Sequence, residues 1–177
     1  MKKNKGMTLF IAVTIMGILL FISFAVVNIT LKGTLFASSG RDSQYAFYAA
    51  DAGLECAFYW DSKFDSFATS TSGSPISCAG TPIATGSVPS GTSTPTLIGG
   101  GGDADPVSVF GFVMNQVGQG ANPVPHCAIV TVKKSYEDIN PVDGYKERLM
   151  TYIKSRGYNT CDTSNPRRVE RGIGVTY

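Results

Sequence analysis

The residues best suited to catalysis in this chain are one histidine and four cysteines. The single histidine, His126, directly precedes Cys127, and these residue types act as base and nucleophile in cysteine hydrolases. On an extended strand, however, adjacent side chains point to opposite faces, so His126 cannot readily activate Cys127. The sequence contains no HExxH, GxSxG or phosphate-loop pattern. We therefore predict that the chain is not an enzyme and needs no cofactor.

The cysteines are better explained as structural residues. An even number of cysteines following an export-type N-terminus favours an oxidising compartment and two disulfides. No CxxC pair occurs, which argues against a zinc site, and Asp103 with Asp105 lacks the ligand loop that calcium requires. Four cysteines allow three pairings. The favoured pairing joins neighbouring elements, and its bonds are Cys127–Cys161 and Cys56–Cys78.

The charges are distributed unevenly along the 177 residues. The formal net charge is +2, but three of the fifteen basic residues, Lys2, Lys3 and Lys5, precede a long apolar run. Without them 12 basic residues face 13 acidic ones, so the charge gives no indication of nucleic-acid binding. Residues 41–126 are mainly acidic and residues 127–177 mainly basic. This asymmetry is typical of solvated faces, and it also fits opposite patches that meet another copy of the chain.

The long apolar run itself, residues 7–31, contains no Asp, Glu, Lys or Arg. A helix of 25 residues is about 37 Å long and can cross a hydrocarbon core of about 30 Å. The basic residues before it favour a cytoplasmic N-terminus and an exported C-terminal part. The run is too long for a conventional secretory signal. A permanent single-pass anchor and an anchor with a short removable leader remain as alternatives.

The leader alternative depends on Gly6, which ends the basic segment "KKNKG" just before "MTLFIAV". This arrangement resembles the class III leader of type IV pilins and pseudopilins. The resemblance implies cleavage by a prepilin peptidase after Gly6 and N-methylation of the new N-terminal residue, Met7. The family places glutamate at the fifth mature position, where this chain has Ile11. That departure suits certain minor subunits rather than a major pilin.

A second motif sharpens this resemblance. The stretch "QYAFYAADAGLECA", residues 44–57, is similar to the segment that follows the anchor in PilX-like minor pilins, with Asp51, Gly53 and Glu55 at matching positions. Those pilins also tend to lack the fifth-position glutamate. The resemblance covers about the first third of the chain. It implies a long N-terminal helix whose outer half packs on a β-sheet.

The residues after the run independently predict an amphipathic helix. An apolar stripe at spacings of 4, 3, 4 and 3 is expected to face the sheet, and its members are Tyr45, Ala49, Ala52, Cys56 and Tyr59. Gly33, Ser38, Ser39 and Gly40 are poor helix formers, so one bent helix and two separate helices are both compatible with the sequence.

The remainder of the chain predicts a loop followed by a sheet. Residues 66–105 are rich in Ser, Thr, Gly and Pro, which predicts an irregular loop. Four β-branched and aromatic segments predict an antiparallel meander of about four strands, and they span residues 106–114, 127–134, 147–155 and 167–177. The expected fold is α+β. Its parts are a leader (residues 1–6), a transmembrane helix (7–32), an amphipathic helix (33–62) and an exported β-rich domain (63–177).

Two functional hypotheses follow. In the first, the chain is a minor subunit of a type IV pilus or related filament, held in the membrane until assembly, and its partners are the prepilin peptidase, other pilins, the assembly platform and lipid. In the second, it is a single-pass membrane protein with an exported binding or adhesion domain that does not polymerise. Both place the N-terminus in the cytoplasm and the C-terminal domain outside.

Overall fold

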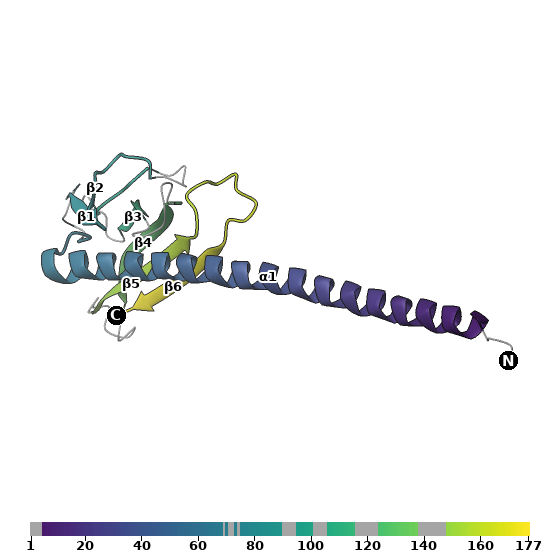
Figure 1. Cartoon of the computed structure of the whole chain (residues 1–177). Coiled ribbons are helices and arrows are strands. Elements are labelled where there is room, and N and C mark those ends of the chain that lie inside the picture. Colours follow the sequence, from purple (N-terminus) through teal and green to yellow (C-terminus); the bar gives the residue numbers. More distant parts are fainter. Residues whose placement is uncertain are drawn as a thin grey trace. The chain divides into compact units, whose positions relative to one another are not determined.

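The computed structural model of the chain describes residues 5–68, 70, 73, 75–89, 95–100, 106–115, 124–137 and 148–177. The elements run in the order α1 (Lys5–Phe64), β1 (Ile76–Cys78), β2 (Thr81–Ile83), β3 (Val107–Met114), β4 (His126–Glu137), β5 (Arg148–Tyr158) and β6 (Glu170–Thr176) (Figure 1). The expected α+β class is confirmed. The chain forms two units, Met1–Arg41 and Asp42–Tyr177. The described part of the first is helical, and the second holds the end of α1 and all these strands.

One helix, rather than two, runs through the glycine- and serine-containing stretch near residue 40. The intrinsic cost there is about 1 kcal/mol for each glycine. Helix α1 ends where Asp65 adopts a positive φ of 46°. The Asp65 amide donates to the Asp61 carbonyl at 3.1 Å, the bond of an αL C-terminal motif.

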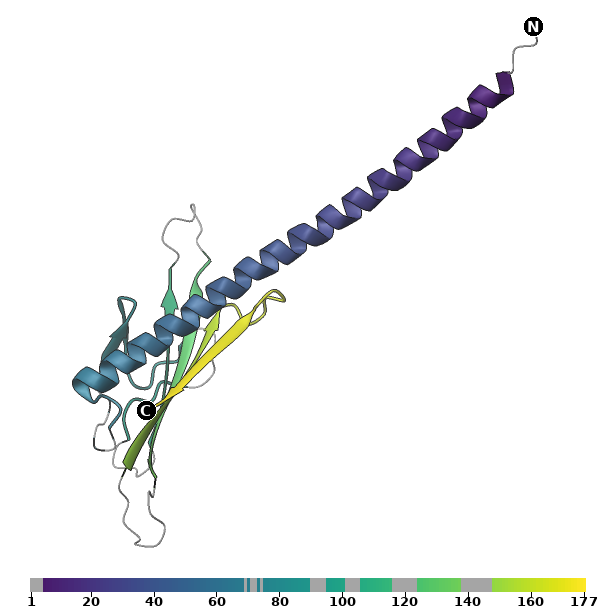
Figure 2. The ribbon, with the colours of Figure 1, turned by 90° about the horizontal axis from the view of Figure 1, so that it is seen from below.

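Strands β3 to β6 form a four-stranded antiparallel sheet in sequential order. Each of the four segments predicted from the sequence overlaps one of these strands, and the predicted ends differ from the observed ends by at most three residues. The end of α1 lies across one face of the sheet, as seen within the second unit in Figure 2. The core between them contains Ala57 from α1, Phe110 and Phe112 from β3, and Val130 and Ile153 from β4 and β5.

The line of α1 that is buried against the sheet differs from the predicted stripe by one residue. Its members are Ala46, Ala50, Gly53 and Ala57, each the next residue after a predicted position. Of the predicted residues, Ala49 is buried, Tyr45, Ala52 and Cys56 are partly buried, and Tyr59 is 51% exposed. One residue is a rotation of about 100°, so the prediction identified a flank of the helix.

Small residues face the sheet because the two backbones approach closely. A Cβ atom added at Gly157 of β5 would overlap the backbone of Ala46 and Ala50. One added at Gly53 would overlap the Ser155 hydroxyl and lie 2.9 Å from Val130 Cγ2. Tyrosine cannot occupy such a contact, and Phe47, Tyr48, Phe58 and Tyr59 are exposed on other sides of the helix. Trp60, beyond the close contact, packs against the core.

The segment 66–105 was wrongly predicted to be irregular throughout. It contains the antiparallel hairpin β1–β2 and a bridge between Leu97 and Val109. Four of its large apolar residues are buried in the core, and these are Phe67, Ile76, Ile83 and Ile98, whereas Val88 and Leu97 are exposed. Phe67 stacks on Phe110 with ring centroids 5.7 Å apart. The polar composition of the segment therefore gave no indication that these residues contribute to the core.

Candidate functional site

The first candidate site is the apolar surface of α1 in the first unit. The large hydrophobic side chains between Met7 and Leu31 are exposed, from 45% at Ile11 to 80% at Phe21. The described part of the chain has one helix that is long and apolar enough to cross a membrane, judged by length and composition. Such a surface requires an apolar environment, which a bilayer or other apolar helices can supply.

The polar residues inside this surface bond to the helix itself. Thr14 donates to the carbonyl of Ile11 at 2.9 Å, Ser23 to Leu19 at 2.8 Å and Thr30 to Val26 at 2.9 Å. The Asn28 amide donates to the Phe24 carbonyl at 3.1 Å. Because these donors find partners within the helix, their presence in hydrocarbon costs less than their polarity suggests.

The expected cleavage point lies at the start of α1. Gly6 and Met7 are in its first turn, and the Met7 side chain is 66% exposed. The first turn has amides without helical partners and is the part of a helix that frays first. Residues 1–4 of the predicted leader are outside the described residues.

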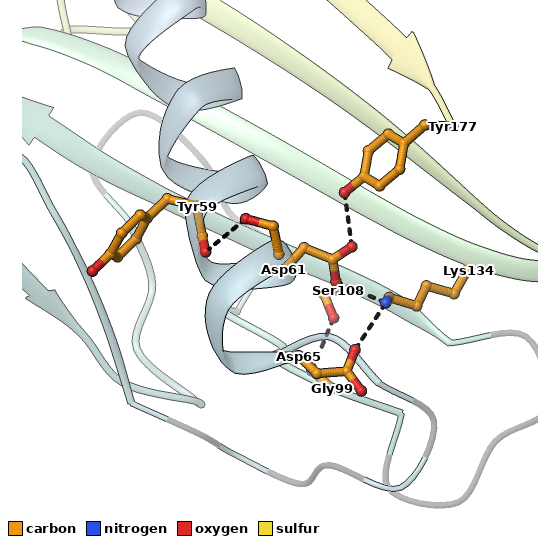
Figure 3. Close-up of polar contacts among 8 residues, drawn as sticks. Tyr59, Asp61, Asp65, Gly99, Ser108, Lys134 and Tyr177 are labelled. Atoms are coloured by element: carbon orange, nitrogen blue, oxygen red, sulfur yellow. Dashed lines mark hydrogen bonds and ion pairs between the residues drawn. The ribbon is translucent and has the colours of Figure 1, made fainter.

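A second candidate site is the polar cluster at the other end of α1 (Figure 3). Lys134 of β4 lies with its Nζ atom 2.7 Å from Asp61 Oδ1 and 3.1 Å from Asp65 Oδ1. The hydroxyl of Tyr177 donates to Asp61 Oδ2 at 2.7 Å. The side chains of Lys134 and Asp61 are each 5% exposed, so this is a buried ion pair that ties the end of the helix to the sheet.

The cluster shifts the pKa values of two of its members. Burial alone would lower the pKa of Lys134, but hydrogen bonds and charge attraction from Asp61 and Asp65 outweigh burial and raise it. Burial and the hydrogen bond to the Asp61 carboxylate raise the pKa of the Tyr177 hydroxyl well above its ordinary value. The cluster therefore holds a charged lysine and a neutral tyrosine at physiological pH.

The segment between β5 and β6 and the first residues of β6 contact α1 near the start of the second unit. Arg167 forms an ion pair with Asp42 at 3.2 Å, and Arg171 Nε donates to the Ser43 hydroxyl at 2.8 Å. Tyr45 stacks on His126 with ring centroids 4.8 Å apart. These contacts and the lysine cluster fasten both ends of this part of the helix.

Two disulfides complete the second unit. Cys56 of α1 is bonded to Cys78 of β1, with Cα atoms 5.8 Å apart, and Cys127 of β4 to Cys161, with Cα atoms 5.2 Å apart. This is the pairing favoured from the sequence. The first bond attaches the hairpin to the helix, where Trp60 Nε1 also donates to the Ser77 carbonyl at 2.9 Å.

His126 and Cys127 form no nucleophile–base pair in this structure. Cys127 is in a disulfide, and His126 Nδ1 lies 2.7 Å from the Asn159 carbonyl. Within the described ranges no three His, Cys, Asp or Glu residues are grouped to hold a metal ion. Asp103 and Asp105, considered above as calcium ligands, lie outside those ranges.

Sequence reasoning missed the lysine cluster and the glycine contact. Lys134 and Asp61 are 73 positions apart, and Gly157 and Ala46 are 111 apart, so local patterns could not pair them. One signal was available for the lysine. Lys134 lies on the same face of a predicted strand as Ala128, Val130 and Val132. A charged residue on such an apolar face needs a buried partner.

No family model, curated protein or solved structure matches this chain. The class of protein is therefore defined here by architecture alone. A long N-terminal apolar helix on an antiparallel sheet is pilin-like in its general arrangement.

Proposed function

We propose that the chain is a minor subunit of a type IV pilus or a related filament. The observation that carries this proposal is a single helix with two different surfaces. Its first part exposes apolar side chains without a charge between residues 7 and 31, and its last part is packed on a sheet. In lipid the first part is an anchor, and among sister helices it becomes part of a filament core, because both surroundings are apolar.

The leader supports the same proposal. Cleavage after Gly6 removes Lys2, Lys3 and Lys5 and leaves the apolar helix in the membrane. The processed chain then starts at Met7, whose amine is methylated. In the proposal the partners are a prepilin peptidase, other pilin subunits and the assembly platform, and the PilX-like motif with Ile11 at the fifth position supports a minor role.

Mass spectrometry of the chain purified from its own cells tests the processing step. The proposal expects a mature N-terminus at methylated Met7. An intact Met1, or a start at any other residue, would contradict it.

Shearing of intact cells separates the proposal from a non-polymerising membrane protein. A filament subunit is released with the sheared filaments, whereas a single-pass binding protein stays with the membrane. Immunodetection of the chain in both fractions gives the answer.

A further inference from the structure

One exposed face of the second unit is acidic. On α1, the side opposite the buried line of Ala46 to Ala57 carries an acidic helix stripe at spacings of 3, 4 and 4, made of Tyr48, Asp51, Glu55 and Tyr59. Tyr48 is 65% exposed and Tyr59 is 51% exposed. Among the described residues, no ion pair involves Asp51 or Glu55. The stripe therefore has two acids between two aromatic rings and faces away from the sheet.

A second exposed face of the same unit is basic. The sheet surface turned away from α1 carries a basic sheet face, made of Lys133, Tyr152, Lys154 and Arg156. On β6, the residues paired with Lys154 and Arg156 are Gly174 and Gly172. A Cβ atom added at Gly172 would meet only the Ser155 carbonyl, at 3.7 Å. A Cβ atom added at Gly174 would lie 3.5 Å from the Tyr152 hydroxyl. The cations thus border two β6 positions that have no side chain on this face, and the Tyr152 side chain lies beside one of them.

Other charges of this face lie at its end. Glu170 is paired with Tyr158, and Arg168 stacks over the Tyr158 ring at 3.8 Å. Glu170 is two residues along β6 from Gly172 and therefore lies diagonally beside Arg156, and Glu137, paired with Arg148, lies beyond Tyr152. Among the described residues, the strand positions paired with Lys154 or diagonal to it carry no acid.

The charge spacings on the two faces match. Asp51 and Glu55 are four helical residues apart, about 6 Å along the axis. Lys154 and Arg156 are two strand residues apart, about 7 Å along β5. A helix laid along Gly172 and Gly174, beside the Tyr152 side chain, can therefore place both carboxylates beside both cations, with the tyrosines of the stripe near the ends of the contact.

We propose that the acidic helix stripe of one copy docks on the basic sheet face of a second copy. The two surfaces lie on opposite sides of one unit, so the contact is heterologous and leaves each end of a pair free to bind again. Charge complementarity sets the register of such a contact and speeds encounter. The association extends the proposed function but does not depend on it, because it requires neither cleavage after Gly6 nor a filament.

Charge reversal in the full chain, purified in detergent, tests the proposal by analytical ultracentrifugation. One variant combines Asp51→Lys with Glu55→Lys, and a second combines Lys154→Glu with Arg156→Glu. Each variant alone places like charges opposite each other, and we expect its self-association to be weaker than that of the wild type by at least about tenfold. An equimolar mixture of the two variants restores opposite charges at every contact and should associate as the wild type does.

Two controls separate this contact from other causes. The fourfold variant has the net charge of the wild type with both faces exchanged, and it should self-associate again. Lys63→Glu changes an exposed cation one turn beyond Tyr59, outside the charge pairs of the contact, and should not weaken association. Wild-type association should also weaken between about 0.1 M and about 1 M salt, as the Debye length falls from about 10 Å to about 3 Å.

Three results would overturn the proposal. The first is a wild type that remains monomeric at low salt. The second is association that neither reversal weakens, which would assign it to the apolar helix. The third is a weakening by one reversal alone or a mixture that fails to associate, which would show that the acidic helix stripe and the basic sheet face do not bind each other.

Discussion

At the scale of single residues, two glycines determine how closely helix and sheet pack. Gly157 lies against the backbone of Ala46 and Ala50, and Gly53 lies against Ser155 and Val130. Backbone atoms cannot move aside as the end of a flexible side chain can, so added volume at Gly157 must separate the two layers.

Gly157→Ala is therefore expected to destabilise the second unit by about 3 kcal/mol, the upper part of the range for overpacking. Gly172→Ala is the matched control on the neighbouring strand, because its Cβ atom meets only a carbonyl at 3.7 Å. Denaturant unfolding of the full chain in detergent measures both variants. Equal stability of the two would show that the layers are not in the close contact described here.

The polar cluster around Lys134 is the other feature at this scale, and it is expected to make the stability of the folded chain fall at alkaline pH. The pKa values of Lys134 and Tyr177 are both raised in the folded state. The unfolded chain therefore loses these protons first, at a pH of about 10. The stability that the two groups contribute is complete below that pH and falls as the pH rises above it.

Tyr177→Phe should flatten part of this alkaline decline. At neutral pH it should also cost about 2 kcal/mol, the range for a hydrogen bond to a charged group. Tyr48→Phe changes a tyrosine that is 65% exposed and serves as control. The free energy of unfolding, measured from pH 7 to above pH 10, checks the expectation, and an unchanged slope in Tyr177→Phe would refute the assigned contact.

At the scale of elements, the two disulfides constrain different segments of the second unit. The bond Cys56–Cys78 holds the hairpin on the helix, and Cys127–Cys161 holds the segment that carries Arg167 and Arg168. Their sequence separations are 22 and 34 residues. In the chain-entropy model these loops correspond to roughly 3 and 4 kcal/mol.

Replacing one cysteine pair by serines should therefore loosen one place only. Without Cys127 and Cys161, amide hydrogen exchange is expected to rise in residues 159–169, and without Cys56 and Cys78 in residues 76–83. Each variant is the control of the other. The assignment fails if both variants raise exchange in the same segment.

The sequence predicted elements better than it predicted contacts. The apolar helix and the four long strands are marked by an uncharged run and by alternating β-branched residues, so their places followed from local patterns. The hairpin β1–β2 has strands of three residues, too short for a pattern. The helix stripe was displaced because the prediction followed the helical spacing of apolar residues from Tyr45 to Tyr59, whereas the contact with Gly157 selects small side chains.

At the scale of the whole molecule, function follows from one chain that carries two kinds of surface. The first unit exposes apolar side chains that need lipid or other helices, and the second has a closed core with charged faces. Neither the proposed cleavage step nor the proposed filament can be read from contacts within one chain, because both involve other proteins. Both hypotheses rest on two sequence features, the leader and the motif at residues 44–57.

The central claim is that Gly6 directs maturation and that the matured chain enters a filament. The most direct test replaces Gly6→Ala in the native cells and examines the sheared filament fraction by immunodetection and mass spectrometry. Gly33→Ala is the matched control, since a Cβ atom there has no atom within 4 Å. The account predicts that the control chain is found in the fraction starting at methylated Met7, while the Gly6→Ala chain keeps Met1 and stays in the membrane. A Gly6→Ala chain that matures and reaches the filaments as the control does would contradict it.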